Sequence, residues 1–184
     1  MKKMLLTAVV ALVTLSASAQ VYLGGEVGLW RNPDANTTQF NLRPDVGYKL
    51  SNKWALGIAL QYNHTYVEGL KANSMGVNPY VRYTVAKFGP VNVFLDGGFE
   101  FNSIKWENRD SANEWGIGIK PGIAVNLTEK LSFVTHLGFL GYNDTDEGEF
   151  IGDEGAGGFY GISNDNGFGF RFDNYCGFGL YYNF

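Results

Sequence analysis

The chain has 184 residues, a formal net charge of −4 at pH 7 and one cysteine, Cys176. This length suits a single domain. The acidic balance without a basic block argues against nucleic-acid binding, and a lone cysteine excludes an internal disulfide. With 25 glycines, 16% aromatic residues and only 17% charged residues, the composition favours an all-β protein.

The beginning of the chain has the three parts of a secretory signal peptide. Lys2 and Lys3 are positive, Met4–Leu15 is apolar, and Ala17-Ser18-Ala19 is a small-x-small cleavage site. The apolar run is shorter than the roughly 20 residues of a transmembrane helix. We therefore expect residues 1–19 to be cleaved and residues 20–184 to form one domain. An uncleaved N-terminal anchor helix is the alternative.

In the rest of the chain, apolar residues alternate with polar or small residues at a period of two, which predicts β-strands. The clearest case is 114–127, where Trp115 and Ile117 alternate with Gly116 and Gly118. The same period recurs in eight segments, at about 21–30, 38–50, 54–63, 74–86, 91–102, 114–127, 131–142 and 168–184. Their connections are short after the even-numbered segments and longer after the odd-numbered ones. This pattern predicts an eight-stranded antiparallel up-and-down transmembrane β-barrel.

Alternation alone does not say which face of the barrel is outside, since a soluble lipocalin-like barrel has its apolar face inside. An interior formed by eight strands is too narrow for the many large apolar side chains of one face. The opposite face is too rich in glycine and alanine to make a good soluble surface. Aromatic residues also gather near both strand ends, as expected at two membrane interfaces. They are Trp30, Phe40, Tyr62, Trp115 and Phe170 toward the longer loops, and Tyr48, Trp54, Tyr83 and Tyr182 toward the short turns.

The face predicted to point inward carries acidic and basic residues in nearly equal number. They are Glu26, Arg43, Asp45, Lys49, Arg82, Asp96, Glu100, Lys120, Arg171 and Asp173. Buried charges must be paired or hydrogen-bonded, because an isolated one is strongly unfavourable. We expect a cross-strand network of salt bridges that plugs the lumen. A proton or ion path is the alternative.

The chain resembles small outer-membrane barrel proteins of the OmpX/OmpA-barrel type, and more closely the outer-membrane β-barrel domain proteins of the Bacteroidota. The resemblance rests on Ala17-Ser18-Ala19-Gln20, on Asn78-Pro79-Tyr80-Val81-Arg82-Tyr83, and on an aromatic-rich final strand. That strand ends with Phe178, Leu180, Tyr182 and Phe184 at alternate positions.

The resemblance implies a location in the outer membrane of a Gram-negative bacterium. It also implies that the barrel-assembly machinery reads the C-terminal residues as a signal, and an amphipathic strand of this kind could pair with the edge of another barrel. The expected partners are outer-membrane lipid, lipopolysaccharide and that machinery. We expect a monomer without a cofactor.

Few residues in the sequence suggest a catalytic site. His136 is predicted to point inward, on the same face as Ser132, but it is four positions farther along the strand, a distance of about 13 Å. That is too far for a nucleophile and its base. His64 is expected near a long loop, where the sequence does not exclude a meeting with Ser103 or Ser111. We expect no enzyme activity, and a lipid A-modifying enzyme is the alternative.

The longest loop, Asn143 to Gly167, contains seven acidic residues and no lysine or arginine. Clustered carboxylates suggest Ca²⁺ or Mg²⁺, but Asp144-Thr145-Asp146-Glu147-Gly148 lacks the EF-hand order of ligands. A solvated acidic loop is expected, and divalent cations that bridge it to lipopolysaccharide phosphates are the alternative. Cys176 is expected to face lipid as a small apolar side chain. The expected role is structural or interactive, in envelope integrity or in adhesion through the loops. A narrow pore is a further alternative.

Overall fold

The computed structural model describes residues 20–33, 36–67, 70–107, 111–146, 167–171 and 178–184. Its strands are β1 (Val21–Asn32), β2 (Thr37–Lys49), β3 (Trp54–Val67), β4 (Leu70–Phe88), β5 (Val91–Trp106), β6 (Ala112–Asn126), β7 (Leu131–His136), β8 (Phe139–Thr145), β9 (Gly167–Arg171) and β10 (Phe178–Asn183). No helix in these ranges is long and apolar enough to cross a membrane.

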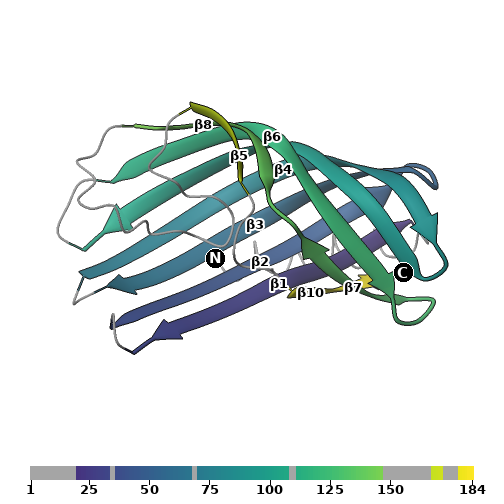
Figure 1. Cartoon of the computed structure of the whole chain (residues 1–184), viewed down its shortest axis with the longest axis horizontal. Helices are drawn as coiled ribbons and strands as arrows, with labels where there is room; N and C mark the ends of the chain where they lie inside the picture. The colour runs from purple at the N-terminus through teal and green to yellow at the C-terminus, as the bar shows by residue number, and fades with distance from the viewer. Residues whose placement is uncertain (1–19, 34–35, 68–69, 108–110, 147–166, 172–177) are drawn as a thin grey trace, which may run out of the picture.

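The strands close into an eight-stranded antiparallel barrel (Figure 1). Strands β1 to β6 pair in chain order. Both β7 and β8 pair with β6, so together they form the seventh barrel strand. Strands β10 and β9 form the eighth, because they pair with β7 and β8 respectively. The barrel closes where β1 pairs with β10 from Tyr22 to Val27. The predicted fold class is confirmed.

The seventh barrel strand is interrupted by a bulge that the sequence pattern does not reveal. Gly122 lies opposite His136, whereas Ile119 lies opposite Leu140, so the strand holds one extra residue here. Gly138 occupies the bulge with φ 121°, a conformation that favours glycine. The alternation of Leu131 and Phe133 predicts that Phe139 faces lipid as well, but the extra residue reverses the alternation and Phe139 is buried.

The hairpins at the loop end are longer than predicted. Only residues 68 and 69 separate β3 from β4, because Val67 pairs with Leu70. The prediction of a long loop after the third strand is therefore wrong. The expected acidic loop is also shorter, because Asn143 and Thr145 belong to β8 and are buried. At the opposite end, short turns connect β2 to β3, β4 to β5 and β6 to β7 (Figure 1).

The outer surface of the barrel is apolar, as a lipid-facing surface must be. Leu29 and Met75 have exposed fractions of 72% and 68%. Val21 alternates in step with the exposed Leu23, and the sequence pattern therefore predicts it on this face, but it is buried. Aromatic residues pack at both rims of this surface. Trp54 contacts Tyr83 at the turn end, with 4.6 Å between ring centroids, and Trp115 contacts Phe99 and Tyr142 toward the loop end.

Large aromatic side chains inside the barrel lie over glycines of the neighbouring strands. Tyr80 of β4 lies opposite Gly57 of β3, and a Cβ atom on Gly57 would be 2.3 Å from the Tyr80 ring. The same relation holds for three further pairs, Tyr22 over Gly47, Phe94 over Gly122 and Tyr181 over Gly24. The inward glycines therefore make room for a few large rings in a narrow interior.

Candidate functional site

Most of the charged residues predicted to face inward do lie inside the barrel. Glu26, Arg43, Asp45, Asp96, Glu100 and Lys120 are all buried. The Arg82 side chain is 12% exposed. Lys49 is half-buried and lines a cavity at the turn end. The side chain of Arg171 and the whole of Asp173 lie outside the described residues.

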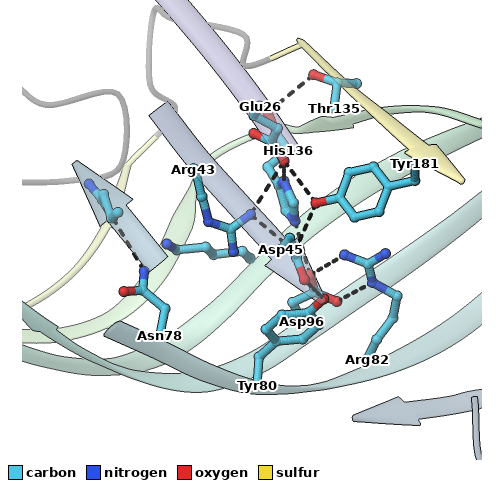
Figure 2. A network of polar contacts seen from close by, with 12 residues as sticks. Glu26, Arg43, Asp45, Asn78, Tyr80, Arg82, Asp96, Thr135, His136 and Tyr181 are labelled. Atoms are coloured by element: carbon cyan, nitrogen blue, oxygen red, sulfur yellow. Dashed lines mark hydrogen bonds and ion pairs between the residues drawn. The ribbon is translucent and has the colours of Figure 1, made fainter. Parts of the chain in front are cut away.

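His136 lies at the centre of this interior and joins two carboxylates from opposite sides of the barrel (Figure 2). Its Nδ1 is 2.9 Å from Glu26 Oε1 of β1, and its Nε2 is 2.9 Å from Asp96 Oδ2 of β5. An ionised carboxylate only accepts hydrogen bonds, so both ring nitrogens must donate. This geometry fits an imidazolium between two carboxylates.

Two arginines complete the charge balance around His136. Arg82 donates two hydrogen bonds of 2.7 Å to the two carboxylate oxygens of Asp96. Arg43 Nη1 is 3.3 Å from Glu26 Oε1 and 3.6 Å from Asp45 Oδ2. The three carboxylates of Glu26, Asp45 and Asp96 therefore face two guanidinium groups and one imidazolium. A cluster that is neutral overall and rich in hydrogen bonds is the form in which buried charges are tolerated.

Three tyrosines provide hydroxyl groups to the same cluster. Tyr80 and Tyr181 donate to the two oxygens of Asp45 over 2.7 and 2.8 Å. Because the single Tyr80 hydroxyl proton is used there, Tyr22 donates to the Tyr80 oxygen, at 2.7 Å. The Arg82 guanidinium also lies 3.9 Å from the ring centroid of Phe94, within cation–π distance.

Tyr22, Tyr181 and Phe94 are interior residues that are not among those predicted from the sequence. A signal was present, because each has the same parity as an inward-facing residue of the same strand. Tyr22 precedes Glu26 by four residues, Phe94 precedes Asp96 by two, and Tyr181 follows Gly179 by two.

A second polar layer lies next to the central cluster, on the loop side. Lys120 Nζ forms an ion pair with Glu100. Asn78 Nδ2 donates to Glu100 Oε1 and to Gln61 Oε1, both over 3.3 Å. Farther toward the loops, Asn102 Nδ2 donates to Glu114 Oε2 over 3.4 Å. The interior is thus filled by successive layers of polar side chains.

Two cavities of very different size border the central cluster. A cavity of about 560 Å³ opens at the turn end, and its inner wall includes Tyr22, Arg82, Phe94 and Tyr181. Beyond this wall, a space of only about 20 Å³ lies beside Arg43, Asp96 and Lys120. The central cluster therefore occupies the level at which a channel would have to pass.

The geometry does not bring a nucleophile and a base together at the histidines. Both His136 nitrogens contact carboxylates, while the Ser132 hydroxyl donates to Asn126 Oδ1 over 2.9 Å. His64 contacts Asn73 Oδ1 over 2.8 Å. Within the described ranges, no group of three or more His, Cys, Asp or Glu residues is arranged to hold a metal ion.

The C-terminal residues lie on the outer surface in strict alternation. Phe178, Leu180, Tyr182 and Phe184 have exposed fractions from 38% to 56%, whereas Tyr181 points inward. Cys176 and residues 147–166 of the acidic segment lie outside the described residues.

This fold, with an apolar outer belt, aromatic rims and a polar filled interior, defines the class of transmembrane β-barrels. A family model described as "Outer membrane protein beta-barrel domain" matches residues 4–184, and the chain belongs to this family of outer-membrane proteins.

Two similar proteins extend this comparison. An uncharacterised protein of Haemophilus influenzae is 25% identical over 169 residues, covering 80% of this chain and 95% of the relative. The crystal structure of Neisserial surface protein A covers 91% of this chain and 98% of its own, with 15% identity and a TM-score of 0.47.

Proposed function

We propose that the protein is a plugged structural barrel of the outer membrane that acts through its exposed surfaces. It supports envelope integrity, and its loop end contacts ligands or surfaces outside the cell. Residues 1–19 serve as the cleaved export signal. The observation that supports this proposal is the ion bridge from Glu26 through His136 to Asp96, which crosses the interior.

This bridge argues against the two alternative functions, a pore and an enzyme. It occupies the interior together with two arginines and three tyrosines, so passage of ions would require several buried charge pairs to separate. Breaking one such pair is strongly unfavourable. It also uses both nitrogens of His136, which leaves that residue without a ring nitrogen to act as a base. The surfaces that remain for function are the lipid-facing belt and the two ends.

The belt and the C-terminal strand support the proposed partners. The outward side chains of β10, such as Leu180 and Tyr182, present an apolar stripe to lipid that Phe184 continues past the strand. The same stripe is the feature that the barrel-assembly machinery would recognise during insertion. At the loop end, the connection from β8 to β9 is the longest of the chain and rich in carboxylates. It is the segment that we propose contacts lipopolysaccharide or an external ligand.

A gene deletion tests the proposal and separates its two parts. Sensitivity to sodium dodecyl sulfate and vancomycin would be measured in the deletion strain, with the full chain and with a version in which a Gly-Ser linker replaces residues 147–166. We expect the full chain to restore resistance. Restoration by the shortened version assigns envelope integrity to the barrel, and failure despite normal outer-membrane levels assigns it to the loop.

Two results would contradict the proposal. One is a deletion strain with unchanged resistance and unchanged binding to host or abiotic surfaces. The other is a change in the lipid A mass spectrum that depends on the protein, because this would identify a lipid-modifying enzyme.

A further inference from the structure

The cavity of about 560 Å³ at the turn end is not used by the proposed function. Its inner wall is formed by the side of the central cluster that faces the turns. There, Phe94 and Val134 are each 1% exposed and belong to an apolar group with Tyr22 and Tyr181. Its rim is formed by the ends of β2, β4 and β6 and by the turns that follow them. The base of the cavity is therefore formed by apolar and aromatic side chains beside the paired Arg82, and its mouth is polar.

Most of the charged side chains at the mouth of the cavity are positive. Lys49, Lys53 and Lys87 line it, whereas Glu129 is the one acidic residue among its lining residues. Lys49 near the end of β2 and Lys87 near the end of β4 line the same cavity. None of the three lysines forms an ion pair with a carboxylate in the part of the chain that the structure describes. Arg82, deeper in the cavity, is neutralised by Asp96.

Like charges gathered at the mouth of a concave site favour an anion there. The cavity volume lies within the range of about 300–1,000 Å³ that is usual for sites that bind small molecules. Its apolar base would receive an apolar group, while the lysines would contact a phosphate or carboxylate.

We infer that the turn-end cavity binds a small anionic amphiphile, with its phosphate or carboxylate between Lys49 and Lys87 and its apolar part against Ala124, which packs on the apolar group at the base. The ligand enters from the side of the membrane that the turns face. Its source is either the headgroup region of an anionic lipid or a soluble molecule. This inference does not depend on the role of the loops.

Isothermal titration of the full barrel in dodecylphosphocholine micelles tests the inference, with 1-naphthyl phosphate as the probe and protein-free micelles as the blank. We expect saturable binding that weakens as KCl is raised, because salt screens the lysine charges. Lys49→Gln with Lys87→Gln should weaken binding at least about tenfold, the effect of losing one or two charge-assisted contacts. The matched control is Lys105→Gln, an exposed lysine at the loop end, and it should bind like the unchanged protein.

Two further titrations test the cavity itself. Neutral 1-naphthol should bind much more weakly than its phosphate. Ala124→Phe should reduce binding with every lysine in place, because Ala124 lines the cavity and packs against its base. Equal binding of naphthol and its phosphate, or equal binding by the double lysine variant, would overturn the inference. Absence of saturable binding to the unchanged protein would also overturn it.

Competition identifies the source of the ligand. Bicelles that contain phosphatidylglycerol should displace the probe if the site receives a lipid headgroup. Retention of the probe in these bicelles points to a soluble amphiphile. Both results require the lysine-dependent anion site that the titrations establish first.

Discussion

His136 of β7 and Asp96 of β5 are joined by a 2.9 Å contact although β6 lies between their strands. The contact therefore runs across the interior and not along a pair of neighbouring strands. On its other side, His136 reaches Glu26 of β1, which is 110 residues away in sequence. One imidazole thus ties three parts of the barrel wall together.

Replacement of His136 should destabilise the barrel strongly. His136→Leu leaves Glu26 and Asp96 buried without one of their donors, and breaking a buried pair in this way costs about 3–5 kcal/mol. Urea unfolding in lipid vesicles, followed by tryptophan fluorescence, measures the change. His64→Gln is the control, because His64 is only partly buried and contacts a single asparagine. Equal stability of the two variants would argue against the bridge.

Arg82 and Asp96 should show strong energetic coupling. Each single variant, Arg82→Met or Asp96→Asn, leaves one partner of a bidentate buried pair behind. The double variant should therefore lose less than the sum of the single losses, with a coupling energy of about 1–3 kcal/mol. A double-mutant cycle built on the same urea unfolding gives this value. Additive losses would mean that the pair does not contribute as a unit.

Gly57 should not tolerate a larger side chain. Gly57→Ala places a methyl group against the Tyr80 ring, so a loss of about 1–3 kcal/mol from overpacking is expected. Gly97→Ala is the matched control, because nothing lies within 4 Å of the added Cβ position. Thermal unfolding of both variants measures the difference. A Gly57→Ala barrel as stable as the control would show that the ring is not confined.

Phe184 should matter for assembly more than for the stability of the finished barrel. Phe184→Ala removes the last outward side chain of the C-terminal stripe, so less protein should reach the outer membrane in folded form. The measured quantity is the heat-modifiable fraction on unheated SDS gels. Phe88→Ala, at an exposed position of β4, should assemble normally. Similar yields for both variants would remove the special role of the C-terminus.

The periodicity of the sequence was sufficient to predict the barrel and the direction of most side chains. It predicted inward positions for Glu26, Arg43 and Asp96 because alternation by two is regular in β1, β2 and β5. It failed at Phe139, because a bulge at Gly138 adds one residue and no turn signature marks it. It also places the end of the third strand at residue 63 and the start of the fourth at residue 74, whereas β3 continues to Val67 and β4 begins at Leu70. Polar residues such as Thr65 hide this extension, although Thr65 is buried in the barrel.

The sequence alone does not predict which interior charges pair with one another. Alternation shows that a side chain points inward, but the partners of His136 depend on which strands face one another across the lumen. That relation follows from the closure of the barrel and from the register of all its strands. The inward tyrosines were missed for another reason, since the neighbouring glycines that make space for them carry no signal of their own.

Single-channel recording of the purified barrel in a planar lipid bilayer measures whether buried ion pairs close the lumen. We predict no discrete conductance steps for the unchanged protein, and steps only when the cluster is removed, as in a variant with Arg43→Ser, Arg82→Ser and His136→Ser that still shifts on heating. Regular ion-conducting steps from the unchanged, folded protein would contradict the account.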